Sequence, residues 1–185
     1  MFYSSFGYYA LVFGLCFSPI IFFYSIKNFR NEEILDYKIL TFAFIQLFLV
    51  LLSFLGLVAS FFLSDFSNET VFNNSHTTIP LFYKITGTWG NHEGSLLLWL
   101  LVLTLFIFIF LWNSKEQPKK YRLLTLLFQQ TIIIGFFIFL LKTSNPFNYL
   151  VPIPEEGLGL NPILQDPALA IHPPILYLGY VGSSI

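Results

Sequence analysis

Long apolar runs alternate with short polar segments along this chain of 185 residues. A helix needs roughly 20 apolar residues to cross the hydrocarbon core of a bilayer, and a charge inside that stretch is costly. Four runs are long enough, and a fifth is cut short by the end of the sequence. The pattern predicts an all-α integral membrane protein, a polytopic helix bundle that forms a single membrane domain over residues 1–185. The expected transmembrane helices lie at about 6–26, 39–63, 95–113, 123–142 and 173–185, the last of them truncated.

The charged residues lie almost entirely between these spans. Seven of the nine Lys and Arg residues fall in two short loops, 27–38 and 115–122, which we call the inner loops. The positive-inside rule places such basic loops on the side from which the protein was inserted. The N-terminus and two longer outer loops, 64–94 and 143–172, are then expected on the opposite side, and the outer loops contain all three histidines.

Charge and cysteine content exclude several classes of function. Charged residues make up 10% of the chain and the net charge is −1, so no basic surface is available for nucleic acid. The interiors of the four complete spans contain no Asp, Glu, Lys, Arg or His, which argues against an ion-translocating subunit. Cys16 is the single cysteine, and a lone thiol allows neither an internal disulfide nor a CxxCH haem attachment.

Small and weakly polar residues form a stripe along each of the first two spans. Residues three or four positions apart share a helix face, and small side chains at that spacing let membrane helices approach closely. We therefore interpret the stripes as packing surfaces of the bundle. They are Gly7, Ala10, Gly14 and Ser18 in the first span, and Gln46, Ser53, Gly56 and Ser60 in the second.

A glycine-rich polar motif, residues 86–95, stands where the first outer loop re-enters the membrane. It contains Trp89, Gly90, His92 and Glu93. One interpretation is a contact for a haem edge or a partner on the outer face. The other is a capping turn in which Glu93 or Ser95 starts the third span and His92 is solvated, and the spacing alone favours this one.

A second motif, residues 159–174, closes the other outer loop and is rich in proline. Asn161-Pro162 and Asp166-Pro167 predict the starts of short helical turns, because Asn and Asp are strong N-caps and Pro suits the first helical position. His172 precedes Pro173 and Pro174. Since a residue before Pro disfavours the α conformation, His172 is expected at the non-helical lip of the fifth span, near the membrane surface.

Histidine is the commonest metal ligand and the usual axial ligand of haem iron. His172 is therefore the best coordinating candidate in the chain, although a single histidine at a membrane edge is more often structural or interfacial. His76 has no supporting context, and we assign it no role.

Three segments together resemble one known family: Thr88–Trp99, Thr143–Phe147 and Leu160–Gly182. In order and spacing they resemble the N-terminal portion of the cytochrome c-type biogenesis protein CcmF family (CcmF/NrfE), the haem lyase membrane subunit of bacteria and of plant or protist mitochondria. The 24 Phe residues favour a mitochondrially encoded member. The expected location is then the mitochondrial inner membrane with the motif loops facing the intermembrane space, and the alternative is a bacterial inner membrane with those loops facing the periplasm.

The resemblance implies a role in cytochrome c maturation. Members of the family receive haem from the haem chaperone CcmE and, with a CcmH-type thioredoxin-like partner, deliver it to the CxxCH motif of apocytochrome c. They also hold a haem b, and by resemblance His172 is one of its axial ligands and so the one residue here that binds a metal, the haem iron. Further outer-face contacts are expected at Trp89, Gly90, His92, Glu93, Asp166, Pro173 and Pro174.

The sequence departs from the family by ending before the tryptophan-rich WWD segment, which binds the chaperone's haem, and before the second intramembrane histidine. We expect either a fragment or one product of a split gene, with the remaining CcmF portion or split subunits as partners and no haem transfer by this chain alone. The alternative function is a structural or transporter-like membrane subunit of a respiratory assembly.

Overall fold

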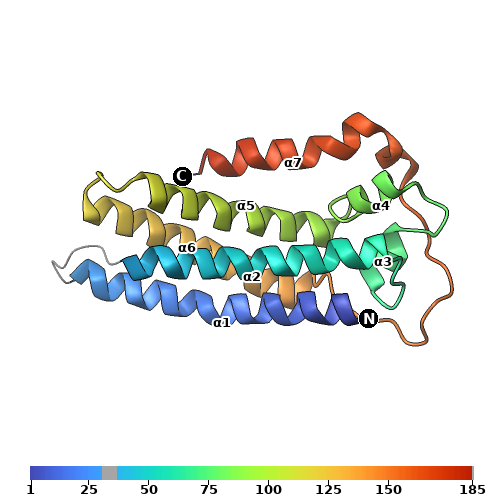
Figure 1. Cartoon of the computed structure of the whole chain (residues 1–185), viewed down its shortest axis with the longest axis horizontal. Coiled ribbons are helices and arrows are strands. Elements are labelled where there is room, and N and C mark those ends of the chain that lie inside the picture. Colours follow the sequence, from blue (N-terminus) through green and yellow to red (C-terminus); the bar gives the residue numbers. More distant parts are fainter. Residues whose placement is uncertain (31–36, 185) are drawn as a thin grey trace.

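The computed structural model describes residues 1–30 and 37–184, which form seven α-helices and one 3-10 helix. Four of these helices, α1, α2, α5 and α6, are long and apolar enough to cross a membrane, and α7 runs beside them (Figure 1). The predicted all-α polytopic bundle is confirmed. The elements are α1 (Phe2–Arg30), α2 (Tyr37–Phe62), α3 (Glu69–Asn74), α4 (Leu81–Gly87), α5 (His92–Asn113), α6 (Lys119–Thr143), η1 (Pro162–Gln165) and α7 (Pro167–Gly182).

The two ends of the bundle differ in content. Figure 1 shows α3, α4, the start of α7 and the N-terminus at one end, which we call the outer end, and the α5–α6 turn at the other, the inner end. The outer loops 64–94 and 143–172 therefore gather together, as the sequence indicates. The predicted inner loop 27–38 lies partly outside the described residues, because 31–36 are not among them.

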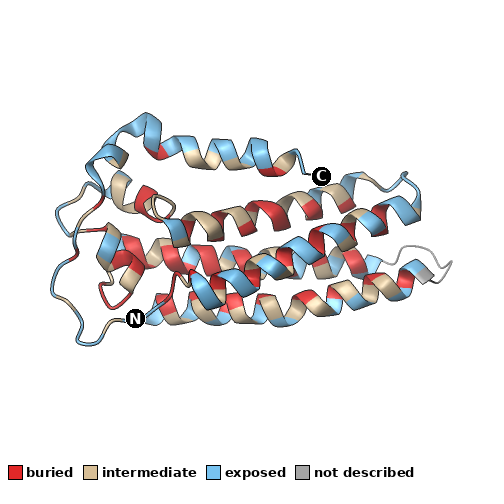
Figure 2. Ribbon diagram, turned by 180° about the vertical axis from the view of Figure 1, so that it is seen from behind, coloured by how far each residue is buried: buried red, intermediate tan, exposed pale blue. Residues whose placement is uncertain are grey.

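The small-residue stripes are the packing surfaces that the sequence predicts. A Cβ atom added to Gly56 of α2 would lie 2.8 Å from the Cα of Gly7 and 2.9 Å from the carbonyl oxygen of Tyr3, both on α1. A Cβ atom on Gly14 would meet the Phe137 ring of α6 at 2.8 Å. The backbones of α1 and α2 thus touch, and Figure 2 shows buried residues on the inward faces of these helices.

Three polar side chains join α1, α2 and α6 inside the bundle. Gln46 Nε2 donates to Ser18 Oγ at 2.7 Å and to Gln130 Oε1 at 3.1 Å, and Gln130 Nε2 donates to Gln46 Oε1 at 2.8 Å. All three residues are fully buried. Because lipid offers no hydrogen-bond partner, the Gln46 amide depends on Ser18 and Gln130, and the Gln130 amide depends on Gln46.

The reciprocal glutamine pair gives a stability prediction. Gln46→Leu leaves the buried amide of Gln130 without its partner and is expected to cost about 1–3 kcal/mol, the usual penalty for an orphaned buried polar group. Replacing both glutamines by leucine removes the penalty along with the bond, so the double variant is expected to lose less than about 1 kcal/mol. Denaturant unfolding in detergent measures both, and additive losses would contradict the pairing.

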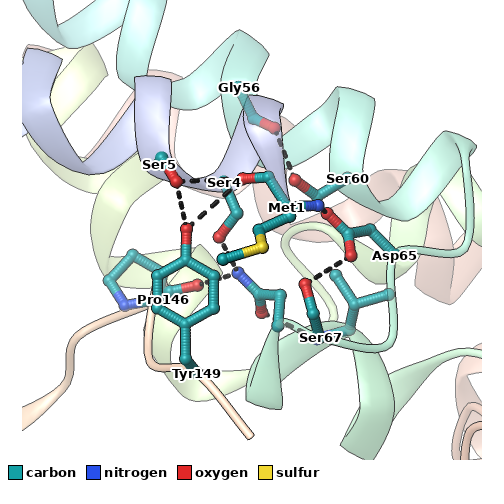
Figure 3. A network of polar contacts seen from close by, with 11 residues as sticks. Met1, Ser4, Ser5, Gly56, Ser60, Asp65, Ser67, Pro146 and Tyr149 are labelled. Atoms are coloured by element: carbon teal, nitrogen blue, oxygen red, sulfur yellow. Dashed lines mark hydrogen bonds and ion pairs between the residues drawn. The ribbon is translucent and has the colours of Figure 1, made fainter. Parts of the chain in front are cut away.

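A polar network closes the outer end, where the start of α1, the start of α3 and the segment after α6 meet (Figure 3). Asn68 is fully buried, and its Nδ2 donates to Ser4 Oγ at 2.8 Å and to the Pro146 carbonyl at 2.9 Å. Its Oδ1 accepts from the Val71 amide at 3.1 Å and so caps α3. Tyr149 also bonds to Ser5. The two outer loops are therefore tied to the first helix.

Helix α7 lies along α5. The rings of Trp99 and Tyr177 stand 5.3 Å apart between centroids, and a Cβ atom on Gly182 would lie 2.8 Å from the Phe106 ring. The remaining surface of α7 is mostly exposed (Figure 2). Helix α7 is thus a peripheral helix fixed to the bundle along one side.

The start of α7 corrects the sequence analysis. The last span was expected from 173 with His172 at a non-helical lip, but α7 begins at Pro167 and His172 lies within it. Asp166 Oδ1 accepts from the amides of Ala168 at 2.9 Å and Leu169 at 3.1 Å, so the Asp-Pro pair starts this helix rather than a separate short turn. The prediction for Asn161-Pro162 is confirmed, because η1 begins at Pro162.

Candidate functional site at the outer end

Asn91 shapes the first motif by capping two helices. Its Oδ1 accepts from the Gly94 amide at 2.7 Å, which caps the start of α5, and its Nδ2 donates to the Gly87 carbonyl at 2.7 Å, at the end of α4. Of the two interpretations of this motif, the capping turn placed the start of the third span at Glu93 or Ser95; α5 instead begins at His92, with Asn91 as its cap. The available signal was Asn91 itself, because Asn is among the strongest N-cap residues.

His92 and Glu93 form the first turn of α5. His92 is exposed and Glu93 is half-buried, and neither side chain makes a hydrogen bond to another described residue. A carboxylate in the first turn interacts favourably with the positive end of the helix dipole. The structure therefore gives Glu93 a local helix-stabilising position and leaves the His92 imidazole open to solvent.

The two motifs meet at the outer turns of α7. Pro173 and Pro174 have no amide hydrogen, so the carbonyls of Leu169 and Ala170 lack the donor that an ordinary helix supplies four residues later. Trp89 takes that place for one of them: its Nε1 donates to the Ala170 oxygen at 2.8 Å. A hydrogen bond between residues 81 positions apart thus connects the first motif to the second.

Neighbouring contacts hold this junction against the bundle. The Trp89 ring stacks on Phe54 of α2 with centroids 6.5 Å apart and an angle of 18° between planes. A Cβ atom on Gly90 would lie 3.3 Å from the side chain of Leu164 in η1, which makes this a close approach of the two outer loops. Trp89, Gly90, Asp166, Pro173 and Pro174 therefore all shape the outer turns of α7.

His172 stands two residues beyond Ala170, on an open and apolar face of α7. Leu169, Ile175 and Leu176, three or four residues away, are each more than 40% exposed. Gly179, two turns further on, is exposed, and a Cβ atom there would meet nothing within 4 Å. The imidazole thus has room on one side for a flat apolar ligand.

This face is suited to one imidazole ligand rather than to an enclosed metal site. Among the residues that the structure describes, no group of three His, Cys, Asp or Glu side chains lies close enough to hold a metal ion. A hollow of about 610 Å³ lies at the inner end beside Tyr121, at the opposite end of the bundle from the start of α7. We base the site on the histidine and its helix rather than on that hollow.

His76 takes part in a different contact. Thr77 Oγ1 donates to a carboxylate oxygen of Glu156 at 2.8 Å, and His76 Nε2 lies 3.6 Å from the same carboxylate. The Thr77 hydroxyl chiefly, with His76 and Lys84 adding to it, lowers the pKa of Glu156. The cluster joins the two outer loops at their surface, away from α7.

The fold and the site together define a multi-pass membrane protein that presents a histidine on an exposed helix at its outer end. The family model described as "Cytochrome C assembly protein" matches residues 89–185, which include the first motif from Trp89 on, the whole second motif and His172. The chain belongs to this family.

Named relatives agree with that assignment. The cytochrome c-type biogenesis protein CycK of Rhizobium meliloti (strain 1021) is 51% identical over 143 residues, which cover 77% of this chain and 21% of CycK. CycK of Bradyrhizobium diazoefficiens is 45% identical over 97% of this chain and 27% of its own length. CcmF of Escherichia coli (strain K12) is 45% identical over 72% of this chain and 21% of CcmF.

A solved structure shares the fold. The cytochrome c haem lyase CcmF matches 99% of this chain with a TM-score of 0.79 and 25% sequence identity, over 29% of the CcmF chain. This chain therefore spans between about a fifth and three tenths of the length of these proteins. The family assignment leaves no support for the alternative of a structural or transporter-like respiratory subunit.

Proposed function

We propose that this chain is part of the membrane subunit of a haem lyase for cytochrome c maturation, and that His172 is an axial ligand of haem iron in it. One observation carries the proposal: an exposed imidazole on an open apolar face of α7, at the junction of both sequence motifs. Membership of the cytochrome c assembly protein family supports the haem-related role.

The residues around His172 fit a haem. A porphyrin is flat and largely apolar, and its iron commonly takes a histidine ligand. The exposed Leu169, Ile175 and Leu176 offer apolar contact, and Gly179 leaves the helix surface flat. Haem b is the form that the family resemblance implies, and the lone Cys16 offers no CxxCH for a covalent attachment. When bound, haem b would supply one-electron chemistry there, and His172 would hold its iron through the imidazole.

The remaining motif residues have separate tasks in this proposal. Asp166, Pro173, Pro174, Trp89 and Gly90 set the course of the outer turns of α7 and thereby the direction of the imidazole. His92 and Glu93, open at the same end of the bundle, are contacts for a partner or for the edge of a haem.

The proposed orientation in the membrane and the proposed partners follow from the positions of the basic residues and of the outer loops. Four basic residues, Lys115, Lys119, Lys120 and Arg122, lie in the α5–α6 turn and the first turn of α6. This is the opposite end from the start of α7, so in this proposal the outer end faces the intermembrane space of mitochondria or, in a bacterium, the periplasm. A CcmE-type haem chaperone, a CcmH-type thioredoxin-like protein and apocytochrome c are the partners expected there. The remaining CcmF portion, on the same or another chain, completes the lyase.

Haem titration of the protein, co-purified with the rest of its membrane complex, tests whether His172 is a ligand of the haem iron. His172→Ala is expected to weaken haemin binding by more than about 100-fold, because even groups that only orient an iron ligand change metal affinity by 10–100-fold. The low-spin absorbance spectrum of the bound haem should be lost in parallel.

His76→Ala is the matched control, because it removes an imidazole from the same end of the molecule but from the Glu156 cluster. It is expected to bind haemin as the wild type does. An unchanged spectrum in His172→Ala, or an equal loss in both variants, would remove His172 from the ligands.

A further inference from the structure

Helix α7 is regular where its own sequence does not favour a helix. His172 and Pro173 each precede a proline, and this position disfavours the α conformation. The two prolines also remove two consecutive helical hydrogen bonds, those to the carbonyls of Leu169 and Ala170. The helix nevertheless runs unbroken from Pro167 to Gly182. Contacts from outside α7 must therefore compensate for the lost hydrogen bonds and the unfavourable backbone preference at this turn.

Trp89 supplies such a contact at the Ala170 carbonyl. Ala170 is 4% exposed, so water has little access to it, and its oxygen accepts the Trp89 indole hydrogen at 2.8 Å. The indole thus takes the place of the amide that Pro174 lacks. It is itself held by the stacked ring of Phe54, which belongs to the membrane-spanning α2.

We infer that Trp89 is a positioning residue for His172: its hydrogen bond to Ala170 keeps the turn that carries the imidazole helical and so fixes the direction of that side chain. The inference rests on the proposed role of His172 as a haem ligand. Trp89 acts through the backbone of α7, two residues before the histidine, and has no direct part in holding the iron.

Trp89→Phe tests the inference, because it keeps an aromatic ring against Phe54 and removes the donor. In the protein co-purified with its complex, we expect haemin affinity to fall roughly tenfold, the scale of one lost bond to a buried carbonyl. The electron paramagnetic resonance signal of the ferric low-spin haem should broaden or shift, because the imidazole is no longer held in one orientation. Wild-type affinity and signal in Trp89→Phe would overturn the inference.

A second variant separates this role from general packing. Pro174→Ala restores an amide hydrogen that can bond to the Ala170 carbonyl within the helix. In that background the tryptophan donor is redundant, so adding Trp89→Phe should change haemin affinity by less than about twofold relative to Pro174→Ala alone. A loss as large as in the wild-type background would overturn the inference, because the indole would then act by another route.

Further variants and measurements separate a positioning role of Trp89 from a folding defect and from a failure of the proposed function. Trp112→Phe, at the inner end of α5 and away from α7, should leave haemin affinity and the signal unchanged. If Trp89→Phe alone fails to fold, recovery of folded protein in the double variant with Pro174→Ala supports the inference, and failure of both overturns it. If His172→Ala binds haemin normally, the proposed function fails. Amide hydrogen exchange at residues 175–180 then still tests whether Trp89 stabilises α7. Faster exchange in Trp89→Phe than in the wild type supports this role of Trp89, and unchanged exchange overturns it.

Discussion

Gly94→Ala is expected to unfold the outer motif and to abolish haem binding with it. A Cβ atom at residue 94 would lie 1.6 Å from the carbonyl oxygen of Thr88 and 2.8 Å from its carbonyl carbon. Both are backbone atoms, so no side-chain rotation relieves the overlap. Thr88 has to move, and Trp89 follows it directly in the chain, so the bond from Trp89 to Ala170 is lost as well.

The same substitution disturbs the cap of α5. The Gly94 amide donates to Asn91 Oδ1 at 2.7 Å, and Asn91 also holds the end of α4. Overpacking of this kind costs up to about 3 kcal/mol and occasionally more, and a backbone overlap belongs at the upper end of that range. In a chain of this size the midpoint of thermal unfolding should fall by roughly 6–12 °C.

Thermal unfolding in detergent, followed by haemin titration, measures both effects. Gly135→Ala in α6 is the control, because it is the same substitution in a helix at a position where a Cβ atom meets nothing within 4 Å. It should leave the unfolding midpoint unchanged or raise it slightly, since alanine favours a helix over glycine. A midpoint for Gly94→Ala within about 2 °C of the wild type, equivalent to less than 1 kcal/mol, would show that the turn is not as tightly packed as described.

Gly56→Val is expected to separate α1 from α2. A Cβ atom at residue 56 would already lie 2.8 Å from Gly7 Cα and 2.9 Å from the Tyr3 oxygen, and valine adds two further methyl groups that point toward the same backbone. Because the obstacle is a helix backbone, α1 has to shift as a unit, at a cost of about 3 kcal/mol or more. Ser4, on the next turn, then loses its bond to Asn68.

Gly135→Val distinguishes helix separation from the general effect of valine in a membrane helix. A Cβ atom at Gly135 of α6 meets nothing within 4 Å, so this variant should unfold within about 1 kcal/mol of the wild type. Denaturant unfolding gives the free energies, and proteolysis reports on the outer loops. Equal stability of the two variants would argue against backbone contact between α1 and α2.

The spans and their packing faces were predictable because each has a strong local signal. An apolar run long enough to cross a bilayer has few alternatives to a helix, and stripes such as Gly7 and Gly56 mark the places where backbones approach. The sequence also placed His76, His92 and His172 at one end, because the basic residues mark the other. These predictions rest only on patterns among residues that are close together in the sequence.

Helix starts and cross-loop contacts were harder to predict. The X-Pro rule describes an average preference, and at His172 it is outweighed by the Asp166 cap and by Trp89. The proline pair does indicate that two carbonyls lack their helical donors. The donor to one of them, Ala170, lies 81 positions away in the chain, and nothing in the local sequence identifies it. The Asn91 cap of α5 had a local signal, because Asn is a strong N-cap residue, but the second bond of Asn91, to the end of α4, is recognised only when both helices are placed.

The glutamine pair also has a consequence for the order in which the protein is made. Gln130 is synthesised 84 residues after Gln46, a delay of roughly 4–17 s at 5–20 residues per second. During that interval Gln46 would be a lone amide in lipid. Ser18 lies only 28 positions earlier, in the preceding helix α1, and can accept the Gln46 amide as soon as α2 inserts. The serine hydroxyl is thus a partner for Gln46 that is already present before Gln130 is made.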